Sequence, residues 1–97
     1  MKSKNISLGE EWQDVRSQIF SEEEIAESDL RVSIIKKLIE ARTEKGISQK
    51  TLESMSGVKQ PIIARMEKGV TDPRLGTVLK VLAPLGLTLT VVPIKKI

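Results

Sequence analysis

Residues 46–69 read GISQKTLESMSGVKQPIIARMEKG, a pattern typical of two short helices separated by a glycine. Ser48 can cap the N-terminus of the first helix, because its hydroxyl can accept a hydrogen bond from a free backbone N–H, and we expect this helix over residues 49–56. Gly57 permits a turn with a positive φ angle, and the second helix follows over residues 60–68. The stretch therefore predicts two helices that meet across a tight turn.

Apolar spacing outside this stretch predicts three further helices and one strand. Ser21 and Glu24 have the spacing of a capping box, and a break in the helix that they open, near residues 28–29, stays an open question. The predicted ranges are 8–20, 21–45 and 74–84 for the helices and 87–94 for the strand. The residues expected to form the core are Ile25, Leu30, Ile34, Ile35, Leu38, Ile39, Leu52, Met55, Val58, Ile63, Met66, Leu75, Val78, Leu79 and Leu82.

The composition excludes several classes of site. The 97 residues contain no cysteine and no histidine, which rules out disulfides, thiolate metal sites and the commonest general base. No apolar run is long enough to span a membrane, and no signal-peptide core is visible, so we expect a cytoplasmic protein without a membrane partner. We also expect no catalytic residues, no metal and no cofactor.

The charge differs sharply between the two parts of the chain. Residues 1–30 hold three basic and eight acidic side chains, a net charge of −5, whereas residues 31–97 hold 13 basic and five acidic ones, a net charge of +8. The basic part suits a polyanion, and the acidic part suits a basic protein. An ordinary solvated surface would explain the acidic run equally well.

A pair of helices in a basic segment suits the major groove of DNA, where the first side chains of the second helix reach the base edges. Gln60 can bond adenine in a bidentate manner, and Lys59 suits a guanine or a phosphate. Pro61 and Ile62 suit a thymine methyl, and Arg65 can reach a base or a phosphate. The candidate DNA-binding residues are Gln49, Lys50, Lys59, Gln60, Pro61, Ile62 and Arg65.

Several residues of this segment carry a resemblance to a known family. Between about residues 34 and 85 the chain resembles the lambda-repressor-like, or Xre-type, helix-turn-helix family, which implies an all-α, five-helix DNA-binding domain over residues 30–86. Glu53 departs from the family pattern, which usually has a small residue there, and we expect its side chain to tilt outward. The matching residues are Ile47, Ser48, Gln49, Leu52, Gly57, Val58, Gln60, Ile63, Arg65, Met66, Glu67, Gly69, Pro73 and Leu75.

The flanks resemble a narrower group, the HigA-type antitoxins of type II toxin–antitoxin pairs, through EEWQDV, KQPIIARMEKG and APLGLTLTVVP. That resemblance implies a protein that represses its own operon and blocks a RelE/HigB-like mRNA endonuclease. An RNA-cleaving toxin should be basic, so the acidic helical extension over residues 1–29 is a candidate toxin-binding region. Trp12 packing on the chain's own long helix is the alternative. The candidate contacts are Leu8, Trp12, Val15, Ile19 and Phe20.

The strand in residues 87–97 needs a partner, because a single strand is not stable alone. We expect it to pair across a two-fold axis, giving a homodimer that reads two half-sites of an operator in double-stranded DNA. Two alternatives stay open, a stand-alone Xre-family repressor without a toxin and a pure protein-interaction module, although the basic segment argues against the latter. The candidate dimer residues are Leu87, Leu89, Val91 and Val92.

Overall fold

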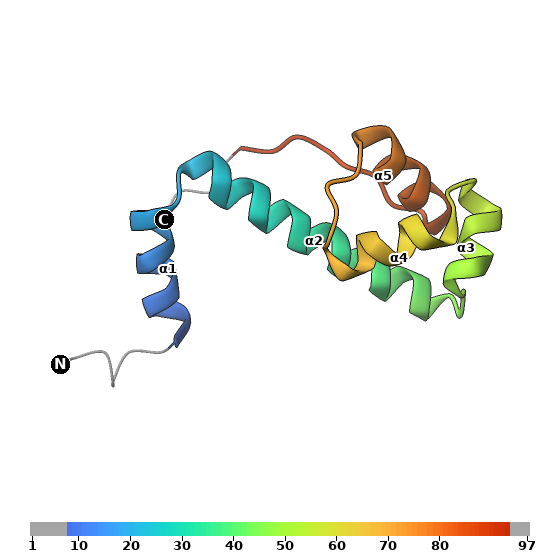
Figure 1. The fold of residues 1–97 in the computed structure, drawn as a ribbon, viewed down its shortest axis with the longest axis horizontal. Coiled ribbons are helices and arrows are strands. Elements are labelled where there is room, and N and C mark those ends of the chain that lie inside the picture. The colour runs from blue at the N-terminus through green and yellow to red at the C-terminus, as the bar shows by residue number, and fades with distance from the viewer. Residues whose placement is uncertain (1–7, 94–97) are drawn as a thin grey trace. The chain divides into compact units, whose positions relative to one another are not determined.

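The computed structural model describes residues 8–93, with side chains described from residue 14 onward, and within that range it has five α-helices and no strand. The helices predicted over residues 49–56 and 60–68 are confirmed, and the N-terminal helix ends one residue earlier than expected. Five is the total with the N-terminal helix included, so the DNA-binding segment has one helix fewer than expected. The elements are α1 (Leu8–Ile19), α2 (Glu22–Glu44), α3 (Gln49–Ser56), α4 (Gln60–Lys68), α5 (Leu75–Leu82) and the 3-10 helix η2 (Ala83–Leu85) (Figure 1).

The chain divides within α2 into two compact units, the first ending at Leu30 and the second beginning at Arg31. In the first unit the capping box is present, because the Glu24 N–H donates to Ser21 Oγ (3.1 Å) and the Ser21 N–H donates to Glu24 Oε1 (2.9 Å). Helix α2 continues without a break through residues 28–29, which settles that question. Its early turns are tied to α1 by Arg16, which donates to Asp29 Oδ1 at 3.0 Å.

The ends of α3 and α4 depend on glycine. Helix α3 begins at Ser48, whose Oγ accepts from the Thr51 N–H at 3.0 Å, and ends at Gly57 with a φ of 79°. Helix α4 ends at Gly69 with a φ of 73°. A Cβ added at Gly69 would lie 3.0 Å from the Cδ1 of Ile35 on α2, whereas one added at Gly57 would meet nothing within 4 Å.

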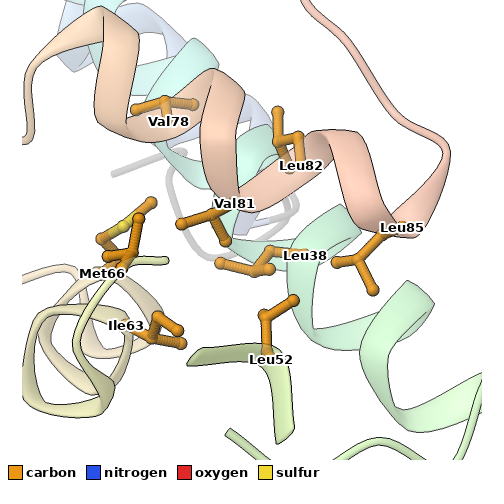
Figure 2. Close-up of a cluster of buried hydrophobic side chains, with 9 residues drawn as sticks. Leu38, Leu52, Ile63, Met66, Val78, Val81, Leu82 and Leu85 are labelled. Carbon is orange, nitrogen blue, oxygen red and sulfur yellow. The ribbon is translucent and has the colours of Figure 1, made fainter. Parts of the chain in front are cut away.

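One hydrophobic core joins the last turns of α2 to α3, α4, α5 and η2 (Figures 1 and 2). Leu38, Leu52 and Ile63 come from three different helices and expose no surface to solvent. Deleting a buried side chain of this size costs about 2–5 kcal/mol, so these contacts hold the helix pair in a fixed relation. Among residues 14–93, the buried members of this core are Leu38, Leu52, Val58, Ile63, Met66, Val78, Val81, Leu82 and Leu85.

The core differs from the predicted one in α5 and α3. Leu75 and Leu79 are 64% and 36% exposed, and the buried stripe of α5 is Val78, Val81 and Leu82 instead. Leu79 is turned about 100° from Val78 on the helix, and Leu75 stands at the first residue of α5. Met55 is 47% exposed, and Leu52 is the buried residue of the eight-residue α3.

Leu30 and the later residues of α2 also fall short of the predicted apolar face. Leu38 is the buried side chain of α2, while Leu30 is half exposed. Ile34 packs against the edge of the core. The face turned toward the other helices is therefore narrower than the spacing of apolar residues indicates.

The strand predicted over residues 87–94 is wrong for the single chain, which forms none in residues 87–93; Ile94 lies outside the described residues. Leu87 and Leu89 pack against the core of their own unit, while Val91 and Val92 are 97% and 68% exposed. A strand needs a neighbouring strand to accept and donate its backbone hydrogen bonds, and the described part of the chain offers none. The alternating apolar residues Leu87 and Leu89 therefore pack against the core instead of forming one face of a sheet.

The helices within residues 8–93 include none with the length and apolar character that crossing a bilayer demands.

Replacing Gly69 by Ala should cost more stability than replacing Gly57 by Ala. Both substitutions force a side chain into a left-handed conformation, at about 1–2 kcal/mol each. Only Gly69→Ala also drives a methyl group against Ile35, which adds roughly 1–3 kcal/mol. Urea denaturation followed by circular dichroism measures both free energies of unfolding, and equal losses would show that α2 yields to the added methyl.

Candidate nucleic-acid interface

Helix α4 presents its first residues at the surface beside the start of α3. Gln60 is the first residue of α4, and Pro61 follows it in the first turn, where no helical hydrogen bond is lost. Gln60 Nε2 donates to Gln49 Oε1 at 2.7 Å, so the two candidate glutamines from different helices are in direct contact. Both side chains are half-buried.

The contact between the glutamines is anchored in an ion pair near the core. Gln49 Nε2 donates to Glu67 Oε1 at 3.0 Å. Glu67 in turn accepts two bonds from Arg42, at 2.6 Å from Nε and 2.8 Å from Nη2, and Arg42 Nη1 also donates to the Ile47 carbonyl at 2.9 Å. The Arg42 and Glu67 side chains are 15% and 7% exposed. A continuous chain of hydrogen bonds, the glutamine relay, thus runs from Arg42 through Glu67 and Gln49 to Gln60.

The relay determines which way each amide points. An ionised carboxylate only accepts hydrogen bonds, so the NH₂ group of Gln49 must face Glu67 and its oxygen must face Gln60. The NH₂ group of Gln60 therefore faces Gln49 with one of its two protons. Its second proton and its carbonyl oxygen can serve another partner, and this donor–acceptor pair is what the major-groove edge of adenine requires.

The Arg42 guanidinium keeps its charge throughout the physiological pH range, and its pairing with Glu67 strengthens that preference. The hydrogen bonds that Arg42 donates to Glu67, which outweigh the opposing effect of burial, raise the pKa of Arg42 above its ordinary value. A bidentate pair between guanidinium and carboxylate also fixes the planes of both groups, which gives direction as well as energy. The Gln60 side chain is therefore connected through Gln49 to a bidentate ion pair.

The remaining candidate DNA contacts are exposed side chains, from Lys50 on α3 to Arg65 in the last turn of α4. The Lys50 and Lys59 side chains are 80% and 78% exposed. Arg65, Pro61 and Ile62 are also exposed. Arg65 follows Pro61 by four residues, so the two share one face of α4. Lys50 and Lys59 lie beside the start of α4 through their contacts with Glu53, and contact of any of these residues with DNA stays a prediction.

Glu53 does not tilt outward into solvent as expected. Its Oε1 accepts from the Gln60 backbone N–H at 3.2 Å and lies 3.2 Å from Lys50 Nζ, and its Oε2 lies 4.0 Å from Lys59 Nζ. The hydrogen bond from Lys50 lowers the pKa of Glu53, helped by the Gln60 N–H and opposed by burial. The side chain stays between α3 and α4 because that site supplies partners for both oxygens.

Sequence reasoning missed the roles of Arg42 and Glu67. In the sequence Glu67 is only a matching position of the resemblance, and nothing marks Arg42. An arginine 25 positions before a glutamate gives no local signal, because their contact depends on how α2 packs on α4.

The candidate residues of the N-terminal unit are described only in part. The side chains of Leu8 and Trp12 lie outside the described residues, so the packing of Trp12 stays a prediction. Val15, Ile19 and Phe20 are 39%, 64% and 42% exposed. Three apolar side chains of the acidic extension are therefore available to a partner.

Known proteins resemble the chain at three levels. The helix-turn-helix family matches residues 38–92, which is more than half of the chain. An uncharacterized HTH-type transcriptional regulator of Haemophilus influenzae is 61% identical over 88 residues, covering 91% of this chain and 90% of that protein. A toxin–antitoxin module from Streptococcus pneumoniae contains a chain that is 71% identical with a TM-score of 0.73, over 84% of this chain and 91% of that one.

Substituting Glu67→Gln should lower the free energy of unfolding by about 3 kcal/mol, because it leaves the Arg42 charge enclosed without its counter-charge. The matched control is Asp72→Asn, which removes an ion pair with Arg31 at 3.6 Å whose carboxylate is 83% exposed. Its loss should stay below about 1 kcal/mol. Urea denaturation measures both, and similar losses would mean that the relay has no rigid base.

Proposed function

The chain belongs to the helix-turn-helix family, and from this we propose that it represses transcription by binding operator DNA in a sequence-specific manner. The observation that carries the proposal is the glutamine relay, which holds the Gln60 amide at the start of α4 with a donor and an acceptor unused. A helix that enters the major groove by its N-terminus brings this amide to a base edge. The family is one of regulators rather than of enzymes.

The other candidate residues have matching roles in this proposal. Pro61 and Ile62 supply an apolar contact for a thymine methyl, next to the adenine read by Gln60. Lys50, Lys59 and Arg65 neutralise phosphates, and Gln49 orients Gln60 besides reaching a phosphate oxygen itself. The net charge of +8 over residues 31–97 supports such a partner.

We further propose that the protein is the antitoxin of a type II toxin–antitoxin pair and neutralises a RelE/HigB-like mRNA endonuclease. The 71% identity to a chain of the Streptococcus pneumoniae toxin–antitoxin module supports this role. The net charge of −5 over residues 1–30 and the exposed Val15, Ile19 and Phe20 also support it, because a protein that cleaves RNA should be basic. We assign toxin binding to residues 1–29 and DNA binding to residues 30–86, both acting in the cytoplasm.

A homodimer is the third element of the proposal, with residues 87–97 assigned to its interface. Val91 and Val92 are exposed, and their backbone forms no strand with any part of residues 8–93, so the same segment of a second copy can pair with it. Leu87 and Leu89 are already engaged with their own core, and they would anchor the segment rather than cross the axis. Two recognition helices related by a two-fold axis would read a palindrome.

A stand-alone repressor without a toxin is the alternative. The 61% identity to the HTH-type transcriptional regulator of Haemophilus influenzae supports the stand-alone repressor as much as the antitoxin, since that name mentions transcriptional regulation and no toxin. The two functions share every DNA-reading residue, so only a protein partner separates them.

Substituting Gln60→Ala should weaken binding to the protein's own promoter by about 1–3 kcal/mol per half-site, which is roughly 5- to 150-fold, and relax the preference for adenine at one position. Fluorescence anisotropy with wild-type and single-base-changed duplexes measures both effects. Gln18→Ala, an exposed glutamine of α1, is the matched control and should change nothing. An unchanged affinity for Gln60→Ala would remove this residue from base reading.

Deleting residues 1–20 should leave promoter binding intact and abolish capture of the toxin. Affinity purification from native cells after nuclease treatment, followed by mass spectrometry, identifies what co-elutes with the full chain and with the deletion. Ile19→Glu should reduce capture without removing the helix, because it places a charge in an apolar contact. A small basic partner retained by the deletion would place the toxin contact elsewhere, and a full chain eluting alone would favour the stand-alone repressor.

A further inference from the structure

A carboxylate lies at the centre of the proposed DNA-binding surface. Helices α3 and α4 contain two acidic residues, Glu53 and Glu67. Glu67 is nearly buried and is neutralised by Arg42. Glu53 is 21% exposed, and it lies among the lysines that are candidates for phosphate binding. A negative charge in this place repels DNA, so it needs a reason other than attraction to the ligand.

Glu53 closes the N-terminus of the recognition helix α4. Lys59 is the N-cap residue of that helix, and its side chain makes no capping hydrogen bond. Glu53 on the preceding helix takes over this task, since its Oε1 accepts from the Gln60 N–H. The Gln60 N–H and the positive end of the helix dipole at this point would otherwise attract a phosphate.

The same carboxylate also engages the flanking lysines. Lys50 Nζ lies 3.2 Å from Oε1, and Lys59 Nζ lies 4.0 Å from Oε2. Either lysine must exchange Glu53 for a phosphate when the protein contacts a DNA backbone. The attraction gained per lysine is therefore smaller than for a lysine without an acidic neighbour.

We propose that Glu53 is a specificity-determining residue that lowers sequence-independent affinity for DNA, by occupying the phosphate-attracting end of α4 and competing for Lys50 and Lys59. This inference rests on the proposed DNA-binding function and adds a regulation of it. A repressor must find one operator among a very large excess of competing sites, so a weaker backbone term raises the share of protein available to the operator. Base reading by Gln60 is untouched, because Glu53 contacts its backbone and not its side chain.

The test is the isosteric variant Glu53→Gln, whose amide oxygen can still accept from the Gln60 N–H while the charge is gone. Binding to a random-sequence duplex is measured by fluorescence anisotropy between 50 and 300 mM KCl, concentrations chosen because each phosphate contact changes the salt slope by about 0.9. We expect the slope of log affinity against log salt to steepen by about 1. Extrapolated from equal affinity near 1 M salt, this gives about tenfold tighter binding at 100 mM KCl.

Glu40→Gln is the control for net charge. Glu40 is exposed on α2 and precedes Arg42 by two residues, so it points to the opposite side of that helix from the relay. It should change random-duplex affinity by less than about twofold. Glu53→Ala removes both the charge and the acceptor and should steepen the slope as Glu53→Gln does, which keeps the test independent of one variant's folding; circular dichroism checks both folds.

The outcomes separate the inference from the function on which it rests. The inference would be overturned if the wild type binds DNA but Glu53→Gln binds the random duplex no more tightly than Glu40→Gln does. That result would leave the proposed function standing. Loss of promoter affinity in Glu53→Gln with unchanged random-duplex affinity would also overturn it, and would instead assign Glu53 to reading a cytosine. No DNA binding by the wild type or any variant at 50 mM KCl would overturn both the function and the inference.

Discussion

The bidentate pair between Arg42 and Glu67 is the interaction on which the proposed reading surface depends. It joins α2 to α4, and Arg42 also donates to the Ile47 carbonyl before α3. Glu67 in turn offers Gln49 a carboxylate that can only accept a hydrogen bond. The orientations of the Gln49 and Gln60 amides follow from this pair, because each amide has only one orientation that matches donors with acceptors. Because the pair is nearly buried, it is little screened by salt, unlike the lysines around it.

The surface of α3 and α4 combines this fixed polar chain with loosely held charge. Lys50 and Lys59 have long, largely exposed side chains, which suit contact with a phosphate backbone. Glu53 lies between them and limits their attraction to any polyanion. In the proposed function, the oriented Gln60 amide would recognise one sequence, and the reduced attraction of the lysines to phosphates would favour release from all others.

The acidic N-terminal unit and the basic second unit carry their charges on separate stretches of chain. Charge of opposite sign on the DNA-reading helices would weaken binding, so a surface for a basic protein partner is better placed outside them. The exposed Val15, Ile19 and Phe20 give that acidic unit the apolar contact area that a charged helix alone would lack.

The sequence by itself determined the local structure. Ser48, Gly57 and Gly69 define where α3 and α4 begin and end, and Gln60 follows at the first position of α4, since capping and positive φ depend on neighbouring residues. The tertiary structure decided what each face meets. It buried Val81 rather than Leu75 and Leu79, formed no strand in residues 87–93, paired Arg42 with Glu67, and drew Glu53 inward to Gln60. These outcomes depend on contacts between residues distant in the chain, which periodicity and local spacing do not encode.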